Sequence, residues 1–415
     1  MWRLLFSGAF VVSCSTAAVQ INDDGAWNWL QDRRAVIAAG KLIVASVAAG
    51  THAEQRAGNV EISSYDLRRQ VKARFTLHKP VDQAGRKLWL NDHNCPGLWV
   101  RPDGRILAMY TLHGADERIY YRISTRAADI TAWDEEQVFI PRPHSRVVFP
   151  SLVYFGSRLF AFFRGLDNRL MPAWASSDDL GGSWQLGNFL IQPPKERGAV
   201  PYPKYAAGLD AVHAGYSTGH RFDRGNGIYY TAFRPDAPML QRPEAGRQIF
   251  QAGAGEVVYI NDVQVDREGN PLIGYSVQKD AATREHRYRY ARRAGANWID
   301  REIAYAGGSL HTDKDDDCTG LMAIDPRRPG VVYISTNAEP LTGKPLPHWE
   351  IFRGQSREGH ETWQWTPVTR NSAVDNIRPV LAGAGSGERA LVWLRGRLVT
   401  YTDFQLEIVA LPLAP

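Results

Sequence analysis

Residues Asn91–Gly114 read NDHNCPGLWVRPDGRILAMYTLHG, a stretch with the form of a β-hairpin. Two apolar runs flank a Pro-Asp-Gly sequence at 102–104, which is typical of a tight turn between strands. Residues equidistant from such a turn face each other in an antiparallel pair. His93 and His113 are equidistant from residue 103, so we expect their imidazoles to lie side by side at one end of the hairpin.

Hairpins of this kind recur along the chain. A Gly-containing turn splits a pair of apolar runs seven times, and neighbouring turns are 52 to 64 residues apart. Long periods with four strands in each unit are typical of β-propeller blades. The sequence therefore predicts an all-β fold, a seven-bladed β-propeller of four-stranded antiparallel blades. The glycines of the seven turns are Gly40, Gly104, Gly156, Gly208, Gly269, Gly330 and Gly387.

Further strands are expected after each hairpin, including Val399–Pro412 (VTYTDFQLEIVALP) in the last unit. The short run Val19–Asn22 (VQIN) is expected to complete the last blade, which closes the ring and removes exposed sheet edges. Ser177–Trp184 (SDDLGGSW) fits the S-x-D-x-G-x-[ST]-W Asp box, a polar turn locked by side-chain hydrogen bonds above a packed indole. A degenerate copy lies at Ser356–Trp363. We assign no catalysis to these turns.

The chain has 415 residues, a net charge of +5 and a pI of about 9.0, which mildly favours a polyanionic partner. Residues 1–18 have the basic start, short apolar run and small-residue end of a signal peptide. We therefore expect a secreted, extracellular protein with a single catalytic propeller domain at 19–415 and no membrane span. Cys95 and Cys318 remain in the mature chain, and the sequence leaves their pairing open.

Polar residues gather at predicted strand ends that meet near the central tunnel on one face. Guanidinium groups bind carboxylate or sulfate, and aromatic faces stack on sugar rings, so this set favours an anionic sugar. By themselves the paired histidines are compatible with acid/base work, a metal site or a structural pair. The candidates are His93, Asn94, His113, Arg164, Tyr202, Lys204, Tyr205, Asn337, Arg378 and Arg395.

An acidic loop, His311–Cys318 (HTDKDDDC), has the carboxylates that Ca²⁺ prefers. A solvated loop is the favoured interpretation, and a structural Ca²⁺ is the alternative. The sequence leaves open whether any other metal is bound.

In order along the chain, a series of short motifs resembles a known family of propeller proteins. The motifs are DGAWNWLQDRRA (Asp24–Ala35), NDHNCP, FFRG, PYPKY, STGH, HRYRYARR (His286–Arg293), NIRP and VWLRG. The pattern is similar to that of the family that includes ulvan lyases of polysaccharide lyase families 24 and 25. Related members act on the rhamnosyl-α-1,4-glucuronate bond of arabinogalactan-type glycans, as lyases or as hydrolases. The similarity spans nearly the whole mature chain and implies a seven-bladed propeller.

The resemblance also implies roles for particular residues. His93 and His113 match the family's paired histidines, and Arg164 matches its carboxylate-neutralising arginine. Ulvan lyases of this type carry a proton-transferring Tyr just inside the third blade, where this sequence has Phe149 in VVFPSL. Because phenylalanine cannot transfer a proton, this departure favours the relatives that release rhamnose from a glucuronate cap, with His93 or His113 as the base and acid.

The implied reaction is a β-elimination. Arg164, helped by Arg378 or Arg395, neutralises the glucuronate carboxylate and stabilises the enolate that develops on removal of the C5 proton. C5–H and O4 lie on the same side of a D-gluco uronate, so one histidine can perform both proton transfers. No cofactor is required. The expected partner is an acidic rhamnose- and glucuronate-containing glycan, with no nucleic acid, and the protein is expected to be a monomer.

Three alternatives stay open. The first is an ulvan lyase, and the second is a glycoside hydrolase acting on the same bond. Hydrolysis usually requires two placed carboxylates, and no convincing pair stands at the tunnel-facing positions. The third is a non-catalytic propeller that binds acidic glycans through its arginines.

Overall fold

The computed structural model describes most of the chain. The described residues are 17–81, 90–114, 116–167, 169–193, 200–220, 222–237, 239–280, 282, 284–311, 318–357, 362–383 and 387–414. The predicted signal peptide, the acidic segment at 312–317 and the middle of the degenerate Asp box fall wholly or largely outside these ranges.

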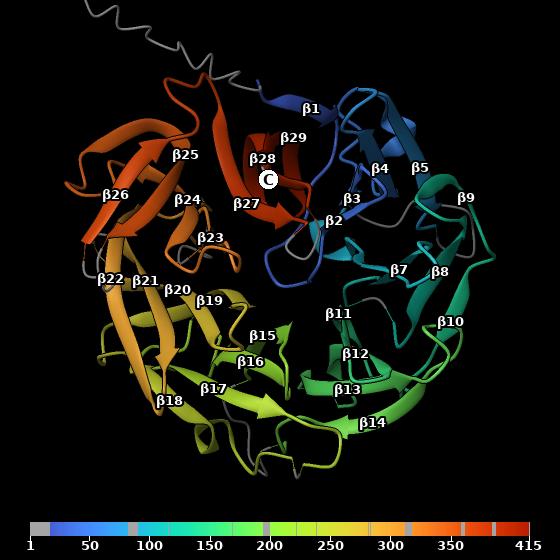
Figure 1. The fold of residues 1–415 in the computed structure, drawn as a ribbon, viewed down its shortest axis with the longest axis horizontal. Coiled ribbons are helices and arrows are strands. Elements are labelled where there is room, and N and C mark those ends of the chain that lie inside the picture. The colour runs from blue at the N-terminus through green and yellow to red at the C-terminus, as the bar shows by residue number, and fades with distance from the viewer. Residues whose placement is uncertain are drawn as a thin grey trace, which may run out of the picture.

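Seven antiparallel sheets stand around a central axis, as the sequence predicts (Figure 1). In chain order the first three blades are β2 (Ala35–Ala38), β3 (Lys41–Val47), β4 (Val60–Asp66) and β5 (Lys72–His78); β6 (Gly97–Val100), β7 (Ile106–Thr111), β8 (Ile119–Arg126), β9 (Asp129–Trp133) and β10 (Gln137–Phe139); and β11 (Val148–Phe155), β12 (Arg158–Gly165), β13 (Met171–Ser177) and β14 (Gln185–Phe189).

The next three blades follow the same plan. They are β15 (Tyr202–Ala207), β16 (Val212–Ser217), β17 (Gly227–Phe233) and β18 (Arg247–Gln251); β19 (Val257–Val265), β20 (Pro271–Asp280), β21 (Glu285–Ala294) and β22 (Asn297–Gly307); and β23 (Met322–Ile324), β24 (Val331–Ala338), β25 (Pro345–Arg357) and β26 (Thr362–Pro367). Each of the seven predicted glycine turns joins the first two strands of a blade.

The seventh blade joins the two ends of the chain. It consists of β27 (Asp375–Ala382), β28 (Arg389–Thr400), β29 (Asp403–Leu413) and β1 (Val19–Asn22). Val19 pairs with Ala410 across β1 and β29, so the prediction that the VQIN strand closes the ring is confirmed. Closure pairs the strand edge that β29 would otherwise present to solvent.

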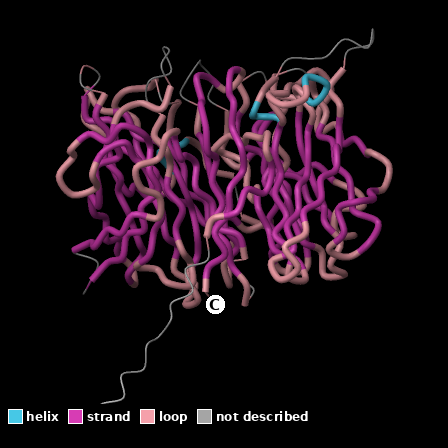
Figure 2. Tube along the Cα trace, turned by 90° about the horizontal axis from the view of Figure 1, so that it is seen from above, coloured by secondary structure: helices cyan, strands magenta, loops and turns pink. Residues whose placement is uncertain are grey.

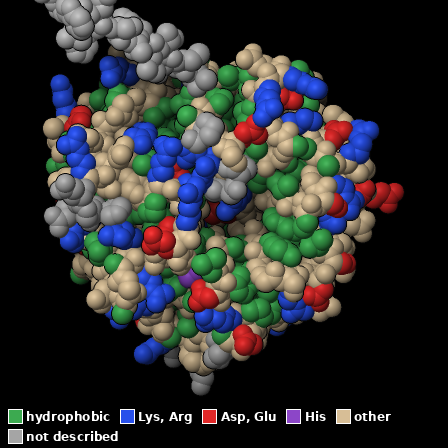
Figure 3. Space-filling model, in the orientation of Figure 1, with side chains coloured by type: hydrophobic (Ala, Val, Ile, Leu, Met, Phe, Trp, Pro, Cys, Tyr) green, Lys and Arg blue, Asp and Glu red, His purple; other side chains and the backbone are tan. Residues whose placement is uncertain are grey.

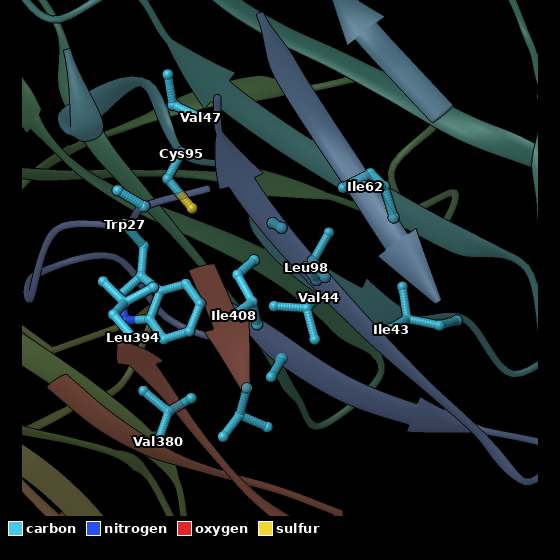
Figure 4. Packing of buried hydrophobic residues seen from close by; sticks show 14 of the residues in the cluster. Trp27, Ile43, Val44, Val47, Ile62, Cys95, Leu98, Val380, Leu394 and Ile408 are labelled. Carbon is cyan, nitrogen blue, oxygen red and sulfur yellow. The ribbon is translucent and has the colours of Figure 1, made fainter. Parts of the chain in front are cut away.

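Burial explains why the inner strands lack a simple polar alternation. Six of the seven residues of β3 are buried, because the neighbouring blades cover both faces of an inner strand. The outer strand β14 has no buried residue. In the core between the seventh and first blades, Trp27 lies beside Leu394 and Val380 (Figure 4). The hydrophobic contribution to stability is therefore concentrated around the axis and between blades.

The two faces of the ring differ. Three short 3-10 helices, η1 (Glu54–Arg56), η2 (Asp92–Asn94) and η3 (Pro243–Ala245), interrupt the loops. Helical turns lie along one edge of the side view and the C-terminus along the other (Figure 2). The seven glycine turns lie on the C-terminal side, so η2 and the end of β7 are on the opposite face. Among the described residues, none forms a helix with the length and hydropathy needed to span a bilayer.

The Asp box forms the predicted polar turn. Ser177 Oγ donates to Asp179 Oδ1 (2.7 Å) and accepts from the Gly181 amide (2.7 Å), and the Ser183 amide donates to Asp179 Oδ1 (2.8 Å). The Trp184 side chain is buried against the second and third blades. The turn lies on an outer hairpin, which fits a structural role.

Candidate active site

Two histidines meet at the central end of the second blade. The ring centroids of His93 and His113 are 4.4 Å apart, which confirms the side-by-side placement predicted from the hairpin. Asn91 caps η2 by accepting the His93 amide (3.0 Å), and Asn94 Oδ1 accepts the His113 amide (2.8 Å). These two asparagines fix the backbone on both sides of the pair, so Asn94 positions a histidine.

A buried carboxylate lies behind His93. Asp92 Oδ1 is 2.6 Å from His93 Nδ1, and Asp92 Oδ2 is 2.5 Å from Arg378 Nη1. Burial acts to raise the pKa of Asp92, but the charges of Arg378 and His93 outweigh it and hold that pKa at about 2. The ionised carboxylate lies against Nδ1 of His93, and Nε2 is at the opposite edge of the ring.

Arg378 stands behind the histidines. Its side chain is fully buried, contacts Asp92 and the Trp27 carbonyl, and has its guanidinium 5.4 Å from the ring centroid of Trp29. A register irregularity in β27 between Ile377 and Val380, with a φ of 53° at Arg378, accompanies this placement. The predicted substrate-binding arginine is therefore a partner of Asp92.

His113 is held in its neutral form. Burial lowers its pKa most, and the charges of His93 and Arg164 lower it further, to about 3. An imidazole with so low a pKa is a weak base at neutral pH, but it keeps one N–H donor and one acceptor.

Arg164, at the end of β12, supplies a positive charge beside the pair. The residue is only 4% exposed, and its guanidinium carbon lies 3.7 Å from the ring centroid of Tyr202. Within the described part of the chain it forms no ion pair, and its Nε has no hydrogen-bond partner. Because a buried unpaired charge is costly, this arrangement suits an anionic ligand that completes the site.

Phe149 forms an apolar wall against the same groups. Its ring centroid is 5.3 Å from that of His93 and 5.4 Å from that of His113, and the guanidinium carbon of Arg164 is 6.0 Å away. Its φ of 61° is rare for an aromatic residue. The structure thus brings Phe149 into contact with the predicted proton-transfer groups.

Tyr401 is a residue that the sequence reasoning missed. Its ring centroid lies 4.9 Å from that of His93 and 6.3 Å from that of His113. Residues Val399–Pro412 were expected to form one strand, but a turn at Tyr401 separates β28 from β29. The available signal was the polar sequence Thr-Tyr-Thr-Asp at 400–403 between two apolar runs.

Two predicted site residues, Lys204 and Tyr205, are buried. Lys204 is almost fully buried, and its Nζ is 2.7 Å from Asp32 Oδ2; burial lowers the pKa of Lys204. Tyr205 stacks on Phe162 with ring centroids 4.2 Å apart. A cavity of about 40 Å³ is lined by Asp32, Tyr205 and Asp262. Both predicted residues are partners of other protein groups, away from the histidine pair.

The remaining two predicted residues also have partners within the protein. Asn337 Oδ1 accepts the Gly308 amide (2.9 Å), which ties the fifth blade to the sixth. Arg395 is 39% exposed at its side chain and is paired with Glu407 on β29. Neither residue contacts the histidine pair. Asn337 is bound to Gly308, and the Arg395 side chain is directed to Glu407 on the neighbouring strand.

In the described residues, the cysteines form no disulfide and the possible metal ligands form no metal site. Cys95 and Cys318 are both buried, and no disulfide joins them. Over the same ranges, no three His, Cys, Asp or Glu residues are grouped closely enough to hold a metal ion. The predicted calcium loop at 312–317 lies outside the described residues.

The fold and the sequence both match known proteins. A family model described as "BNR repeat-containing family member" matches residues 51–306. No curated protein matches the sequence. A solved polysaccharide lyase of family PL25, an ulvan lyase, has a TM-score of 0.68 at 13% identity, over 94% of this chain and 95% of that one. The same enzyme bound to -[GlcA(1-4)Rha3S]- has a TM-score of 0.67 at the same identity and coverage.

More distant propellers are also similar. The GH93 α-L-arabinofuranosidase of Fusarium graminearum with arabinobiose has a TM-score of 0.44 at 13% identity, over 95% of this chain and 97% of that one. That similarity is too low to carry a functional comparison. The comparison with the ulvan lyase structures confirms the predicted resemblance at the level of the fold.

Proposed function

The chain belongs to the BNR repeat-containing family, and from this premise and the site geometry we propose that it is a secreted polysaccharide lyase. The proposed substrate bond is α-L-rhamnosyl-(1→4)-D-glucuronate, cleaved by β-elimination to release rhamnose and an unsaturated glucuronate end. The similar ulvan lyase fold, solved with a glucuronate- and rhamnose-containing oligosaccharide, supports this substrate class.

One observation carries the proposal: Arg164 is a buried cation without an ion-pair partner in the described residues, and it borders two histidines. A glucuronate carboxylate placed against Arg164 would bring C5 of the sugar toward the imidazoles. Neutralising the carboxylate makes the C5 proton more acidic, because the charge that develops on the enolate is then stabilised.

His93 is the base in this proposal. Asp92 orients its ring and leaves Nε2 free to accept the C5 proton, as a carboxylate does behind a catalytic histidine. His113 remains neutral and donates a hydrogen bond to the bound sugar. The C4–O4 bond breaks as the C4–C5 double bond forms, and the departing O4 takes up a proton.

The arrangement favours elimination over hydrolysis. Hydrolysis by two carboxylates needs one acid and one base flanking the bond. Asp92, the carboxylate that contacts the histidine pair, is ion-paired with Arg378 and lies behind His93. Asp92 therefore does not contact a sugar that is bound on the other side of the His93 imidazole.

The test uses two readouts on the same digests. A rhamnosyl-glucuronate arabinogalactan oligosaccharide and ulvan are incubated with the protein, and ultraviolet absorbance of unsaturated uronate and free rhamnose are followed. Absorbance together with rhamnose release is expected from the arabinogalactan substrate. Absorbance from ulvan alone would indicate an ulvan lyase, rhamnose alone a hydrolase, and binding without cleavage a glycan-binding propeller.

A further inference from the structure

We propose that Tyr401 is the proton donor to the departing O4 oxygen. This inference rests on the proposed lyase function and divides its two proton transfers between two residues. The relevant observation is that the β28–β29 turn places a phenol against the base, with 4.9 Å between the ring centroids of Tyr401 and His93.

The backbone fixes this contact. The Asp92 amide donates to the Tyr401 carbonyl (2.9 Å), so the turn and η2 are joined at the residue that orients His93. The turn itself is closed by the Thr402 amide, which donates to Thr400 Oγ1 (3.2 Å). Both hydrogen bonds fix the backbone of the turn beside the histidines.

Tyr202 also carries a phenolic proton, but its ring packs on Arg164, His220 and Tyr259, and in the described residues it has no ring contact with His93 or His113. Phe149 has no exchangeable proton, and His113 is neutral with a pKa near 3. Tyr401 is partly exposed. Phenolic hydroxyl groups are protonated near neutral pH and both donate and accept.

The stereochemistry is compatible with two neighbouring groups. C5–H and O4 lie on the same side of a D-gluco uronate, so the base and the acid must both face that side of the sugar. Tyr401 lies nearly perpendicular to the His93 ring, with an interplanar angle of 71°. The two groups can therefore address adjacent atoms of one sugar from the same side.

Atoms and electrons balance in this step. His93 Nε2 takes the proton from C5, the C5 electron pair forms the C4–C5 double bond, and the C4–O4 bond breaks. Tyr401 gives its hydroxyl proton to O4, so rhamnose leaves with a free hydroxyl group. The imidazolium of His93 then returns a proton to the neighbouring phenolate, and both residues recover their starting forms.

The test compares Tyr401→Phe with wild type and with Tyr154→Phe as the matched control. Tyr154 lies on β11, is 37% exposed and stacks on Trp99, away from the site. We expect Tyr401→Phe to lower kcat about 100-fold, the usual effect of losing a general acid. KM should change less than about threefold and Tm should be unchanged, and the control should behave as wild type.

A second substrate distinguishes a proton donor from a residue that only shapes the site. In a glucuronide that carries 4-nitrophenol at O4, the leaving group departs as 4-nitrophenolate and needs no proton. Tyr401→Phe should therefore cleave this substrate nearly as fast as wild type. Near-wild-type activity of the variant on the rhamnosyl substrate would overturn the proposal, and so would an equal loss on both substrates.

The outcome for the wild-type chain separates the two proposals. Unsaturated product from wild type with an unaffected variant overturns only the role of Tyr401. Rhamnose release without unsaturated product overturns the lyase function. The kcat of Tyr401→Phe relative to wild type, measured by rhamnose release, then decides whether Tyr401 donates the proton. A wild-type chain that cleaves neither glycan overturns both.

Discussion

At the scale of single residues, the site is a chain of contacts from Arg378 through Asp92 and His93 to His113. Arg378 keeps Asp92 ionised, Asp92 orients His93, and burial keeps His113 neutral. The sequence predicted the histidine pair because it followed from turn symmetry. It did not predict the support by Asp92, since a carboxylate adjacent in sequence gives no signal of where its side chain points.

Replacing either histidine should abolish turnover while leaving the fold intact. We expect His93→Ala to lower kcat by about 100-fold or more, since general base catalysis typically contributes that much. His113→Ala should lose activity as well. His52→Ala, at an exposed residue, is the matched control. Full activity of both site variants, with unchanged Tm, would remove the histidine pair from the reaction.

The buried ion pair should be costly to break. Asp92→Asn leaves Arg378 buried without its charge partner, and losses of about 3–5 kcal/mol are typical of such changes. Asp403→Asn is the control, because Asp403 pairs with Arg397 at the surface (2.9 Å, both side chains more than half exposed), where pairs contribute about 0–1 kcal/mol. Urea denaturation measures the free energy of unfolding of both variants. An equal decrease in the two would show that the buried Asp92–Arg378 pair stabilises the fold no more than the surface pair.

The low pKa of His113 also gives a pH dependence of stability. In the unfolded chain this histidine binds a proton below about pH 6.5, its ordinary pKa, whereas the folded chain resists protonation down to about pH 3. The free energy of unfolding should therefore fall as pH drops through this window, by at most about 1.4 kcal/mol per pH unit. His113→Asn should flatten that acid limb in calorimetry; an unchanged slope would contradict the assignment.

At the scale of elements, glycine turns between apolar runs predicted all seven inner hairpins correctly. Two local features could not be read from the sequence. The turn at Tyr401 was missed because Thr, Tyr and Val all favour strands. The register irregularity in β27 was missed because a bulge redirects a side chain without changing the residue pattern. Arg378 is directed to Asp92, whereas Arg395 is paired with Glu407.

Ring closure by β1 gives a prediction at this scale. Ile21 is 4% exposed in the core, so Ile21→Ala should reduce the free energy of unfolding by about 2 kcal/mol or more. Gln20→Ala, on the same strand but exposed, is the matched control. Denaturation with urea reports both changes. A variant Ile21→Ala as stable as wild type would mean that β1 adds little to the closed ring.

At the scale of the whole molecule, positive charge is spread around the channel. Lys and Arg side chains gather about the central hollow on the face drawn in Figure 3. Arg33, Arg267 and Arg327 line a depression of about 560 Å³ that also borders Gly387, on the face of the glycine turns. Because this face is opposite the histidine pair, the long-range attraction of a polyanionic glycan is ascribed to the net charge of +5, which acts over distances beyond direct contact.

Salt should weaken the attraction for a polymer more than for a short substrate. Raising ionic strength from about 0.05 M to 0.5 M shortens the screening length severalfold, so KM for a long acidic glycan should rise several-fold while KM for a trisaccharide changes little. Steady-state kinetics at the two salt concentrations measure the difference. Equal salt effects on both substrates would leave the net charge without a role in capture.

The central claim is that the bond is cleaved by elimination, and isotope labelling tests it most directly. The arabinogalactan oligosaccharide is digested in water labelled with heavy oxygen, and the products are weighed by mass spectrometry. We predict a uronate product lighter by one water, with no heavy oxygen in either fragment at the cleaved bond. One heavy oxygen in the products, and no mass loss, would contradict elimination and identify a hydrolase.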